Sequence, residues 1–320
     1  MNISETAKWL SERDNYLIVT HRRPDGDTIG SAAGLARGLR GLGKTAYILY
    51  NPEITARYLP YAERYWAPDD FLPDNVVAVD TASHELFPVN WENSARRIAL
   101  CIDHHPSNTG YAELSCIDGA RASCGEIIFE ILSRWPGAVD AEVAAALYVA
   151  VSTDTGCFAF GNTTADTLQV ASELARAGAP IAHINRTMFR AKTRARAVLE
   201  GLIFSELEFH FDGRAAIAVV TKDMLARVGA TENELDDIAS LPGSIEGVWA
   251  GITIRELSGP DDCKVSVRSG ENIDSNALCA RFGGGGHPMA AGFTARARVF
   301  DIKAGLLAAL DEILGGKTRP

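Results

Sequence analysis

Residues 16–27 read YLIVTHRRPDGD, and this stretch decides the fold of the first half of the chain. Its first five residues are apolar or β-branched, which predicts a short buried strand. The proline and glycine that follow are typical of a loop, so the strand is expected to end just before His21. Small and apolar residues then recur at helical spacing over 29–42, ahead of a second apolar run at 45–50. The order strand, loop, helix and strand is typical of an α/β domain.

Two further strands are predicted, and both run directly into ionisable residues. Residues 76–79 end on Asp80, and residues 98–102 end on an Asp-His-His sequence at 103–105. An alanine-rich helix then leads to one more acid, Asp154. In open parallel sheets, ligands bind at the carboxyl ends of the strands. We therefore expect these acids and histidines to meet in a single site.

The predicted elements divide the chain into two domains. Strands alternate with helices as far as a long helical stretch at about 165–207, and a β-rich run split in hairpin fashion by Asp212 and Gly213 follows it. We expect a mostly parallel-sheet α/β domain at 1–185, a helical linker at 186–205 and a smaller α/β domain at 206–320. In the second domain, the expected elements are strands 247–257 and 263–269 and helices 275–281 and 301–314.

The composition restricts the class of protein. Of the 320 residues, 47% are hydrophobic and 22% are charged, as in ordinary globular proteins rather than disordered ones. The formal net charge of −10 provides no overall positive field to hold a long nucleic acid, so a small anionic substrate is favoured. The sequence shows neither a signal peptide nor a run of ~18 apolar residues. We expect a cytoplasmic protein without a membrane segment.

The residue types at the strand ends favour a site for two metal ions. Carboxylates with some imidazole, and no thiolate, suit Mn²⁺ or Mg²⁺ better than structural zinc. Four carboxylates brought together repel one another and take up protons unless cations neutralise them, so we expect at least two ions with one shared carboxylate. Two ions roughly 3.5–4 Å apart activate a water between them and hold the leaving oxygen of a phosphoester. The predicted reaction class is phosphoester hydrolysis.

Taken together and in order, these motifs resemble those of a known family. They are His21-x-x-Pro24-Asp25-x-Asp27, Asp80 at the end of a strand, Asp103-His104-His105, and Asp154 in Ser-Thr-Asp-Thr-Gly. This series resembles the four ordered motifs of the DHH phosphoesterases. The glycine run at 283–286 with His287, preceded by Val-Arg-Ser at 267–269, is similar to the substrate-binding domain associated with that family. The resemblance covers nearly the whole chain, and a compact chain with both domains most resembles the nano-RNases.

The resemblance implies that Asp80 bridges two ions. It implies one ion on His21, Asp25 and Asp80, and a second ion on Asp27, Asp80, His104 and Asp154. His105 is then expected to face the substrate phosphate, as a hydrogen-bond donor or as a proton donor to the leaving oxygen. Asp103 is expected to lie behind it and to orient an imidazole. The expected metal is Mn²⁺, with Mg²⁺ as the alternative.

The resemblance also implies that the second domain binds the substrate. Arg268 and His287 are expected to clamp the far phosphate, because a guanidinium suits bidentate phosphate contacts. Ser269 and the backbone of Gly284, Gly285 and Gly286 complete the expected clamp, since glycines let N–H groups approach a ligand closely. The nano-RNases degrade very short oligoribonucleotides and dephosphorylate 3′-phosphoadenosine 5′-phosphate, and some relatives hydrolyse linear or cyclic dinucleotides. A homodimer is expected on the same resemblance.

Other functions stay open at this point. An inorganic pyrophosphatase of the same superfamily is disfavoured by the glycine and histidine signature, which suits a nucleotide. A processive single-strand exonuclease of the RecJ type normally has a longer chain, a strand-binding module and a basic channel. A non-catalytic protein that senses a dinucleotide would not require six metal ligands. Taken alone, a Pro-Asp-Gly-Asp string is an ordinary solvated turn and a glycine run a flexible linker, so the prediction depends on their combination.

Overall fold

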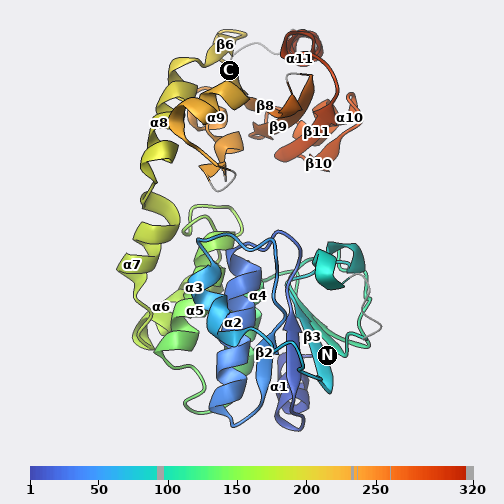
Figure 1. The fold of residues 1–320 in the computed structure, drawn as a ribbon, viewed down its shortest axis with the longest axis vertical. Coiled ribbons are helices and arrows are strands. Elements are labelled where there is room, and N and C mark those ends of the chain that lie inside the picture. Colours follow the sequence, from blue (N-terminus) through green and yellow to red (C-terminus); the bar gives the residue numbers. More distant parts are fainter. Residues whose placement is uncertain (92–96, 232–233, 236, 260, 315–320) are drawn as a thin grey trace. The chain divides into compact units, whose positions relative to one another are not determined.

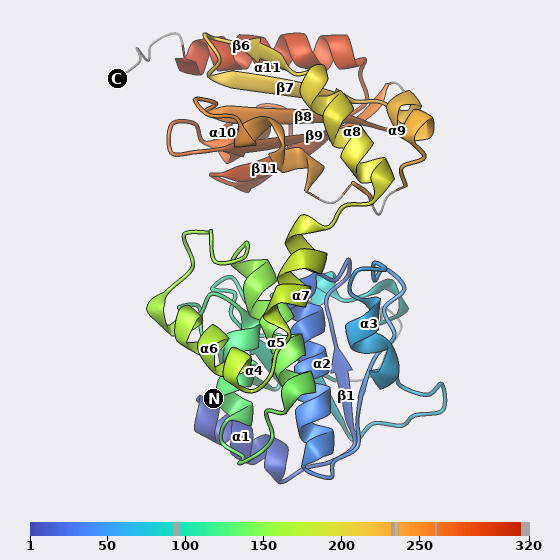
Figure 2. The ribbon, with the colours of Figure 1, turned by 90° about the vertical axis from the view of Figure 1, so that its left-hand side faces the viewer.

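The computed structural model describes the chain except for residues 92–96, 232–233, 236, 260 and 315–320. The chain forms two compact units, Met1–Ala191 and Lys192–Pro320, each with its own sheet (Figures 1 and 2). Both units combine strands with helices, so the expected α/β fold class is confirmed. None of the helices in the described part of the chain is both long and apolar enough to cross a membrane.

The first unit is built on a five-stranded parallel sheet. In spatial order its strands are β2 (Ala46–Ile48), β1 (Tyr16–Val19), β3 (Asn75–Val79), β4 (Leu100–Asp103) and β5 (Leu114–Ile117). The three central strands are almost entirely buried, as is typical of parallel strands rich in Val, Ile and Leu. Because all five strands run the same way, the residues that follow β1, β3 and β4 emerge at one edge of the sheet.

Helices cover one face of this sheet. The main core forms where the sheet meets α1 (Ile3–Ser11), α2 (Gly26–Gly41), α4 (Cys124–Leu132) and α5 (Ala141–Asp154), with further contributions from α3 (Leu59–Ala62), α6 (Ala165–Arg176) and α7 (Ile181–Asn185). On the opposite face, a smaller core joins side chains of β1 and β3 to Phe87, Trp91 and Ile98. The sheet is therefore buried on both faces, as a parallel sheet requires.

A row of glycines brings α2 close to α5. Gly26, Gly30 and Gly34 are spaced four residues apart, so they lie on one face of α2. A Cβ added at Gly30 would lie 2.3 Å from the carbonyl oxygen of Ala146, and one added at Gly34 would lie 2.6 Å from the Leu147 side chain. The small residues at this spacing thus allow the two helices to pack closely.

The second unit has a six-stranded mixed sheet. In spatial order its strands are β10 (Gly285–His287), β11 (Ala290–Ala295), β9 (Asp262–Ser269), β8 (Ala250–Gly259), β7 (Ala215–Val220) and β6 (Glu208–His210). β7 and β8 are parallel, and the other neighbouring pairs are antiparallel. One core includes α10 (Ser275–Ala280) and α11 (Val299–Leu314), and another includes α8 (Arg194–Ser205) and α9 (Lys222–Val228).

Some elements lie where the sequence predicted none. The glycine run enters β10, which pairs with β11, and a Cβ added at Gly284 would lie only 2.3 Å from the Gly292 carbonyl oxygen. Gly284 and Gly286 are thus required by the close approach of two strands. β5 was not predicted; it is a short edge strand whose Leu114 and Ile117 side chains are exposed. The helical stretch expected at 165–207 is divided into α6, α7, a π-helical turn at Arg186–Arg190 and α8.

Candidate metal centre

The loop between β1 and α2 contributes His21 and Asp25. Asp25 is the N-cap of α2, and its Oδ1 accepts hydrogen bonds from the N–H groups of Asp27 and Thr28 at 3.0 and 3.1 Å. His21 Nδ1 donates to the Arg22 carbonyl oxygen at 2.7 Å, because a carbonyl oxygen only accepts. The His21 Nε2 atom is then unprotonated in the neutral ring and lies 3.5 Å from Asp25 Oδ1.

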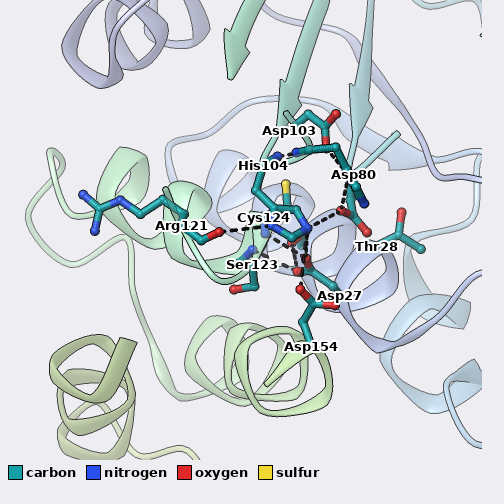
Figure 3. A network of polar contacts seen from close by, with 12 residues as sticks. Asp27, Thr28, Asp80, Asp103, His104, Arg121, Ser123, Cys124 and Asp154 are labelled. Atoms are coloured by element: carbon teal, nitrogen blue, oxygen red, sulfur yellow. Dashed lines mark hydrogen bonds and ion pairs between the residues drawn. The ribbon is translucent and has the colours of Figure 1, made fainter. Parts of the chain in front are cut away.

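Asp27 is buried in the first turn of α2 and is held by the start of α4. Its carboxylate accepts hydrogen bonds from the N–H groups of Cys124 at 2.7 Å and Gly125 at 2.9 Å. The Ser31 hydroxyl, one turn further along α2, donates to it at 3.1 Å. Figure 3 shows Asp27 beside Cys124, below the ring of His104. The N-terminus of α4 thus donates two backbone hydrogen bonds to a buried carboxylate, where the helix dipole favours negative charge.

Asp80 follows the last residue of β3 and lies between the histidines. It is only 3% exposed. Its Oδ2 lies 3.6 Å from His21 Nε2, and its Oδ1 lies 3.4 Å from His104 Nε2. The Oδ1 atom is inaccessible to solvent and accepts no hydrogen bond from any described residue. A buried carboxylate oxygen without a donor is costly unless something else neutralises it.

His104 lies at the centre of a second group of acids (Figure 3). Its Nδ1 donates to the Arg121 carbonyl oxygen at 3.2 Å, so its Nε2 faces the carboxylates. Asp27 Oδ2, Asp80 Oδ1 and Asp154 Oδ2 lie 3.7, 3.4 and 3.5 Å from that nitrogen. Asp154 reaches the group because it is the last residue of α5.

His105 lies near both Asp80 and Asp103. It forms a third candidate ligand group with Asp80 and His104, and its Nδ1 lies 3.6 Å from Asp80 Oδ1. Its Nδ1 lies 2.7 Å from Asp103 Oδ1, which also accepts the His104 N–H at 2.8 Å. The Asp103 carboxylate is completely buried, and Asn108 Nδ2 donates to its other oxygen at 2.6 Å. The sequence reasoning did not identify Asn108. It lies three residues beyond the histidines in a loop, where an asparagine is commonly just a turn residue.

The charges of the cluster are strongly coupled. Burial raises the pKa of Asp27 well above its ordinary value, and the Asp80 and Asp154 carboxylates raise it further. Burial also raises the pKa of Asp154, to about 6. Burial opposes protonation of His104, but the adjacent Asp80 and Asp27 outweigh this effect and raise the pKa of the imidazole to about 10. Without other cations, the cluster therefore has to hold protons on groups that are usually neutral histidines and ionised aspartates.

The donor set fits divalent cations. His21, Asp25 and Asp80 form one group whose ligand atoms lie within 4.8 Å of one another, and Asp27, His104 and Asp154 form another. The nitrogen to oxygen distances of 3.4–3.7 Å are long for hydrogen bonds. They approach the separation of neighbouring ligands around one ion, roughly 3 Å for bonds of about 2.1 Å. The structure thus brings all six predicted ligands together, and they could hold two ions with Asp80 between them.

The predicted substrate residues lie in the second unit. Across the sheet, His287 pairs with Ala290, and Ala290 pairs with Arg268. Directly opposed residues project to the same face, so these three form one cross-strand row with a small residue in the middle. The opposite face of these strands carries Val267 and Ala291, which belong to the hydrophobic core. His287 and Arg268 therefore share the face that does not contain this core.

Ser269 and the glycines form hydrogen bonds with other residues of the second unit. The Ser269 hydroxyl lies 2.7 Å from both the Ile273 carbonyl oxygen and the Ser275 hydroxyl. The N–H of Gly284 donates to the Cys279 carbonyl oxygen at 3.0 Å, and that of Gly286 donates to Asn276 Oδ1 at 2.9 Å. These contacts hold the ends of β9 and β10. Among the predicted clamp residues, Arg268 carries a positive charge and His287 a ring N–H that could be donated to an anion.

Comparison with known proteins gives the same pattern of domains. Residues 15–151 match the DHH family, N-terminal domain, and residues 212–315 match the DHHA1 domain. The chain is 34% identical, over 281 residues, to the bifunctional oligoribonuclease and PAP phosphatase NrnA of Thermus thermophilus, covering 87% of this chain and 83% of that protein.

Solved structures share the fold. An exopolyphosphatase-related protein from Bacteroides fragilis has a TM-score of 0.86 at 23% identity, covering 97% of this chain and 95% of that one. RecJ from Thermus thermophilus in complex with Mn²⁺ has a TM-score of 0.56 at 16% identity, covering 99% of this chain and 55% of that one. The domain matches and the relative of 34% identity carry the assignment. The chain belongs to the DHH family of phosphoesterases and carries the DHHA1 domain after its N-terminal domain.

Proposed function

We propose that this protein is a two-metal phosphoesterase that hydrolyses short oligoribonucleotides and dinucleotides to mononucleotides, and 3′-phosphoadenosine 5′-phosphate (PAP) to AMP. The Thermus thermophilus relative is named for both activities and aligns with most of this chain. The observation that carries the proposal is the position of Asp80 between two groups of histidine and carboxylate ligands at the edge of a parallel sheet. That edge is where such sheets bind their ligands.

Six side chains would hold the ions, for which we propose Mn²⁺, with Mg²⁺ as the alternative. His21 and Asp25 would hold one ion, and Asp27, His104 and Asp154 would hold the other, with Asp80 shared. When bound, such a pair of cations offsets the negative charge that develops on the phosphate oxygens. The carbonyl oxygens of Arg22 and Arg121 fix both imidazoles with Nε2 toward the acids, which is the tautomer a metal ligand needs.

His105 would act on the substrate itself. Its Nδ1 is occupied by Asp103, so Nε2 is the atom available to a phosphate or to the leaving oxygen. The side chain is 41% exposed, unlike those of His21 and His104, which are 17% and 14% exposed. The hydrogen bond to Asp103 raises the pKa of His105 above its ordinary value. A raised pKa favours the protonated ring, which would be able to donate a proton to the leaving oxygen.

The second unit would bind the part of the substrate that does not react. We assign Arg268 and His287 to a phosphate of the nucleotide, because they lie in one row on the same sheet face. A guanidinium binds phosphate through two parallel N–H groups, and an imidazole adds a single donor. Ser269 and Gly284–Gly286 would contribute by holding these strands in place. A nucleotide with a free terminal phosphate is the ligand that this pair suits.

The direct test is a substrate panel with the purified full chain and Mn²⁺. We expect mononucleotides from labelled dinucleotides and AMP from PAP, with slower turnover of cyclic dinucleotides and pyrophosphate. Hydrolysis of pyrophosphate alone would favour the pyrophosphatase, and processive cleavage of long single strands would favour an exonuclease of the RecJ type. Binding of a dinucleotide without any product would make the protein a sensor. We also expect a homodimer, which light scattering would detect as twice the chain mass of 34.3 kDa.

A further inference from the structure

Asp80 has a backbone conformation that L residues rarely adopt. Its φ angle is +53°, in the left-handed region. Its N–H donates to the Ile102 carbonyl oxygen of β4 at 2.9 Å, so the preceding peptide is fixed by the sheet. A left-handed non-glycine residue costs free energy and persists only where its surroundings hold it in place. The peptide that follows Asp80 should therefore have its own restraint.

That restraint is found at the carbonyl oxygen of Thr81. Tyr111 Oη donates to this oxygen at 2.9 Å, and Asn108 Nδ2 donates to it at 3.2 Å. The Thr81 hydroxyl donates in turn to the Val79 carbonyl oxygen at 3.0 Å. Thr81 is completely buried, so water does not compete for these groups. The turn that directs the Asp80 carboxylate is thus held from both sides.

Asn108 connects this turn to the neighbouring loop. Its Nδ2 also donates to Asp103 Oδ2 at 2.6 Å, while its Oδ1 accepts the Gly110 N–H at 2.9 Å, which fixes the orientation of the amide. Asp103 in turn holds His105. One side chain therefore connects the loop after β3 to the loop after β4. Asp80 and His105 reach the site from these two loops.

The Tyr111 ring is itself held by edge-on aromatic contacts. Its centroid lies 5.4 Å from that of Phe87 and 6.5 Å from that of His84. We propose that Asn108 and Tyr111 are positioning residues that hold the Asp80–Thr81 turn and the Asp103 carboxylate, and so set the direction in which Asp80 and His105 present their side chains. This inference rests on the proposed metal-binding role of Asp80, and it goes beyond that role by naming what supports it.

The test compares Tyr111→Phe and Asn108→Ala with Tyr16→Phe in the full chain. Tyr16 is a suitable control because it is completely buried in the same unit, and its hydroxyl donates at 2.6 Å to the carbonyl oxygen of Leu10, which belongs to α1 and not to the site loops. Calorimetric titration of the metal-free proteins with Mn²⁺ should show about tenfold or greater loss of affinity in the first two variants, the usual effect of removing a group that supports a ligand. Tyr16→Phe should stay within about twofold of the wild type.

Kinetics give a second readout that a general loss of stability would not produce. In the Tyr111 and Asn108 variants, kcat on a dinucleotide should fall about tenfold or more, while KM stays within about threefold because the proposed phosphate-binding residues are untouched. Unchanged Mn²⁺ affinity in both variants would overturn the inference, and so would an equal loss in Tyr16→Phe. If neither variant folds while the control does, their role is structural and the inference also fails. A wild type that binds no Mn²⁺ would instead overturn the proposed function.

Discussion

At the scale of single residues, Asp80 lies close to two histidines at once. Its two carboxylate oxygens lie 3.6 Å from His21 Nε2 and 3.4 Å from His104 Nε2. We expect Asp80→Ala to lower turnover of every substrate by more than about 100-fold, the upper end for groups that merely support a ligand. The steady-state rate on a dinucleotide and on PAP in Mn²⁺ would measure this effect. Full turnover on either substrate would contradict the bridging assignment.

Removal of the metal provides an independent prediction for the same residue. An ion that binds the folded chain alone stabilises it by about 2.7 kcal/mol at 100 times its Kd, which is roughly 5–10 °C in unfolding temperature for a unit of this size. The wild type should lose this shift when a chelator replaces Mn²⁺, and Asp80→Ala should never show it. Glu113→Ala, a change at an exposed carboxylate on the same unit, should keep the shift. A metal-dependent shift in Asp80→Ala would count against the assignment.

Arg268 is expected to affect substrate binding rather than the chemical step. It lies in the second unit, in the same cross-strand row as His287, and is not among the groups that could hold ions. We expect Arg268→Ala to raise KM for a dinucleotide about tenfold or more, since hydrogen bonds to charged groups contribute about 1.5–3 kcal/mol, while kcat changes much less. Arg281→Ala, which removes a partly exposed arginine paired with Glu312, is the matched control. A fall in kcat at constant KM would show that Arg268 acts elsewhere.

At the scale of elements, the glycine row of α2 determines how closely this helix packs. Gly30→Ala would place a Cβ 2.3 Å from the Ala146 carbonyl oxygen, so the helices must separate. We expect a loss of about 1–3 kcal/mol in the free energy of unfolding, the usual cost of overpacking. Gly41→Ala is the control, because a Cβ there meets nothing within 4 Å, and it should be neutral or stabilising by up to about 1 kcal/mol. Urea denaturation would measure both, and equal stabilities would contradict the packing argument.

The stability that Glu200 of α8 contributes to the folded chain should depend on pH. Burial alone would raise the pKa of Glu200, but Lys192 and Arg196 beside it lower the pKa below its ordinary value. A carboxylate with a lower pKa in the folded state adds stability at neutral pH, and that stability is lost as the pH falls from about 5 to about 3. Glu200→Gln should therefore unfold at a lower temperature than the wild type at pH 7, with the difference narrowing toward pH 3. Glu206→Gln, at the exposed end of α8, is the control. If its difference in unfolding temperature from the wild type also narrowed toward pH 3, this explanation would be ruled out.

The sequence pattern predicted the strands that lead to the metal ligands. It did not predict the strand and the side chains that hold those parts of the fold in place. β1, β3 and β4 could be predicted because continuous apolar runs end on acids and histidines. By contrast, β10 could not, because a strand of glycine has no side-chain periodicity and exists only through its pairing with β11. Asn108 and Tyr111 were missed for a related reason. Their role depends on the Thr81 carbonyl oxygen, about 30 positions earlier in the chain, and no spacing along the sequence indicates such a contact.

At the scale of the whole molecule, the two units divide the proposed function between them. The first has a core on each face of its sheet and, among the residues that the structure describes, contains all the groups that could hold an ion. The second has cores on both faces of a separate sheet and carries Arg268 and His287. Because each unit buries a core of its own, each is expected to fold alone. The contribution of the second unit can then be measured by removing it.

A fragment of residues 1–191 should therefore still bind the metal ions but hydrolyse the substrate much less efficiently. We expect it to unfold cooperatively and to bind Mn²⁺ within about threefold of the full chain, because no proposed ligand lies beyond Ala191. Its kcat/KM on a dinucleotide should fall by about 100-fold or more, since removing charged phosphate contacts worth about 3 kcal/mol has that effect. The fragment 192–320 should fold without binding Mn²⁺, which controls for weak sites. If fragment 1–191 hydrolysed dinucleotides as efficiently as the full chain, Arg268 and His287 would not be the substrate-binding residues. The phosphate would then have to be bound within the first unit alone.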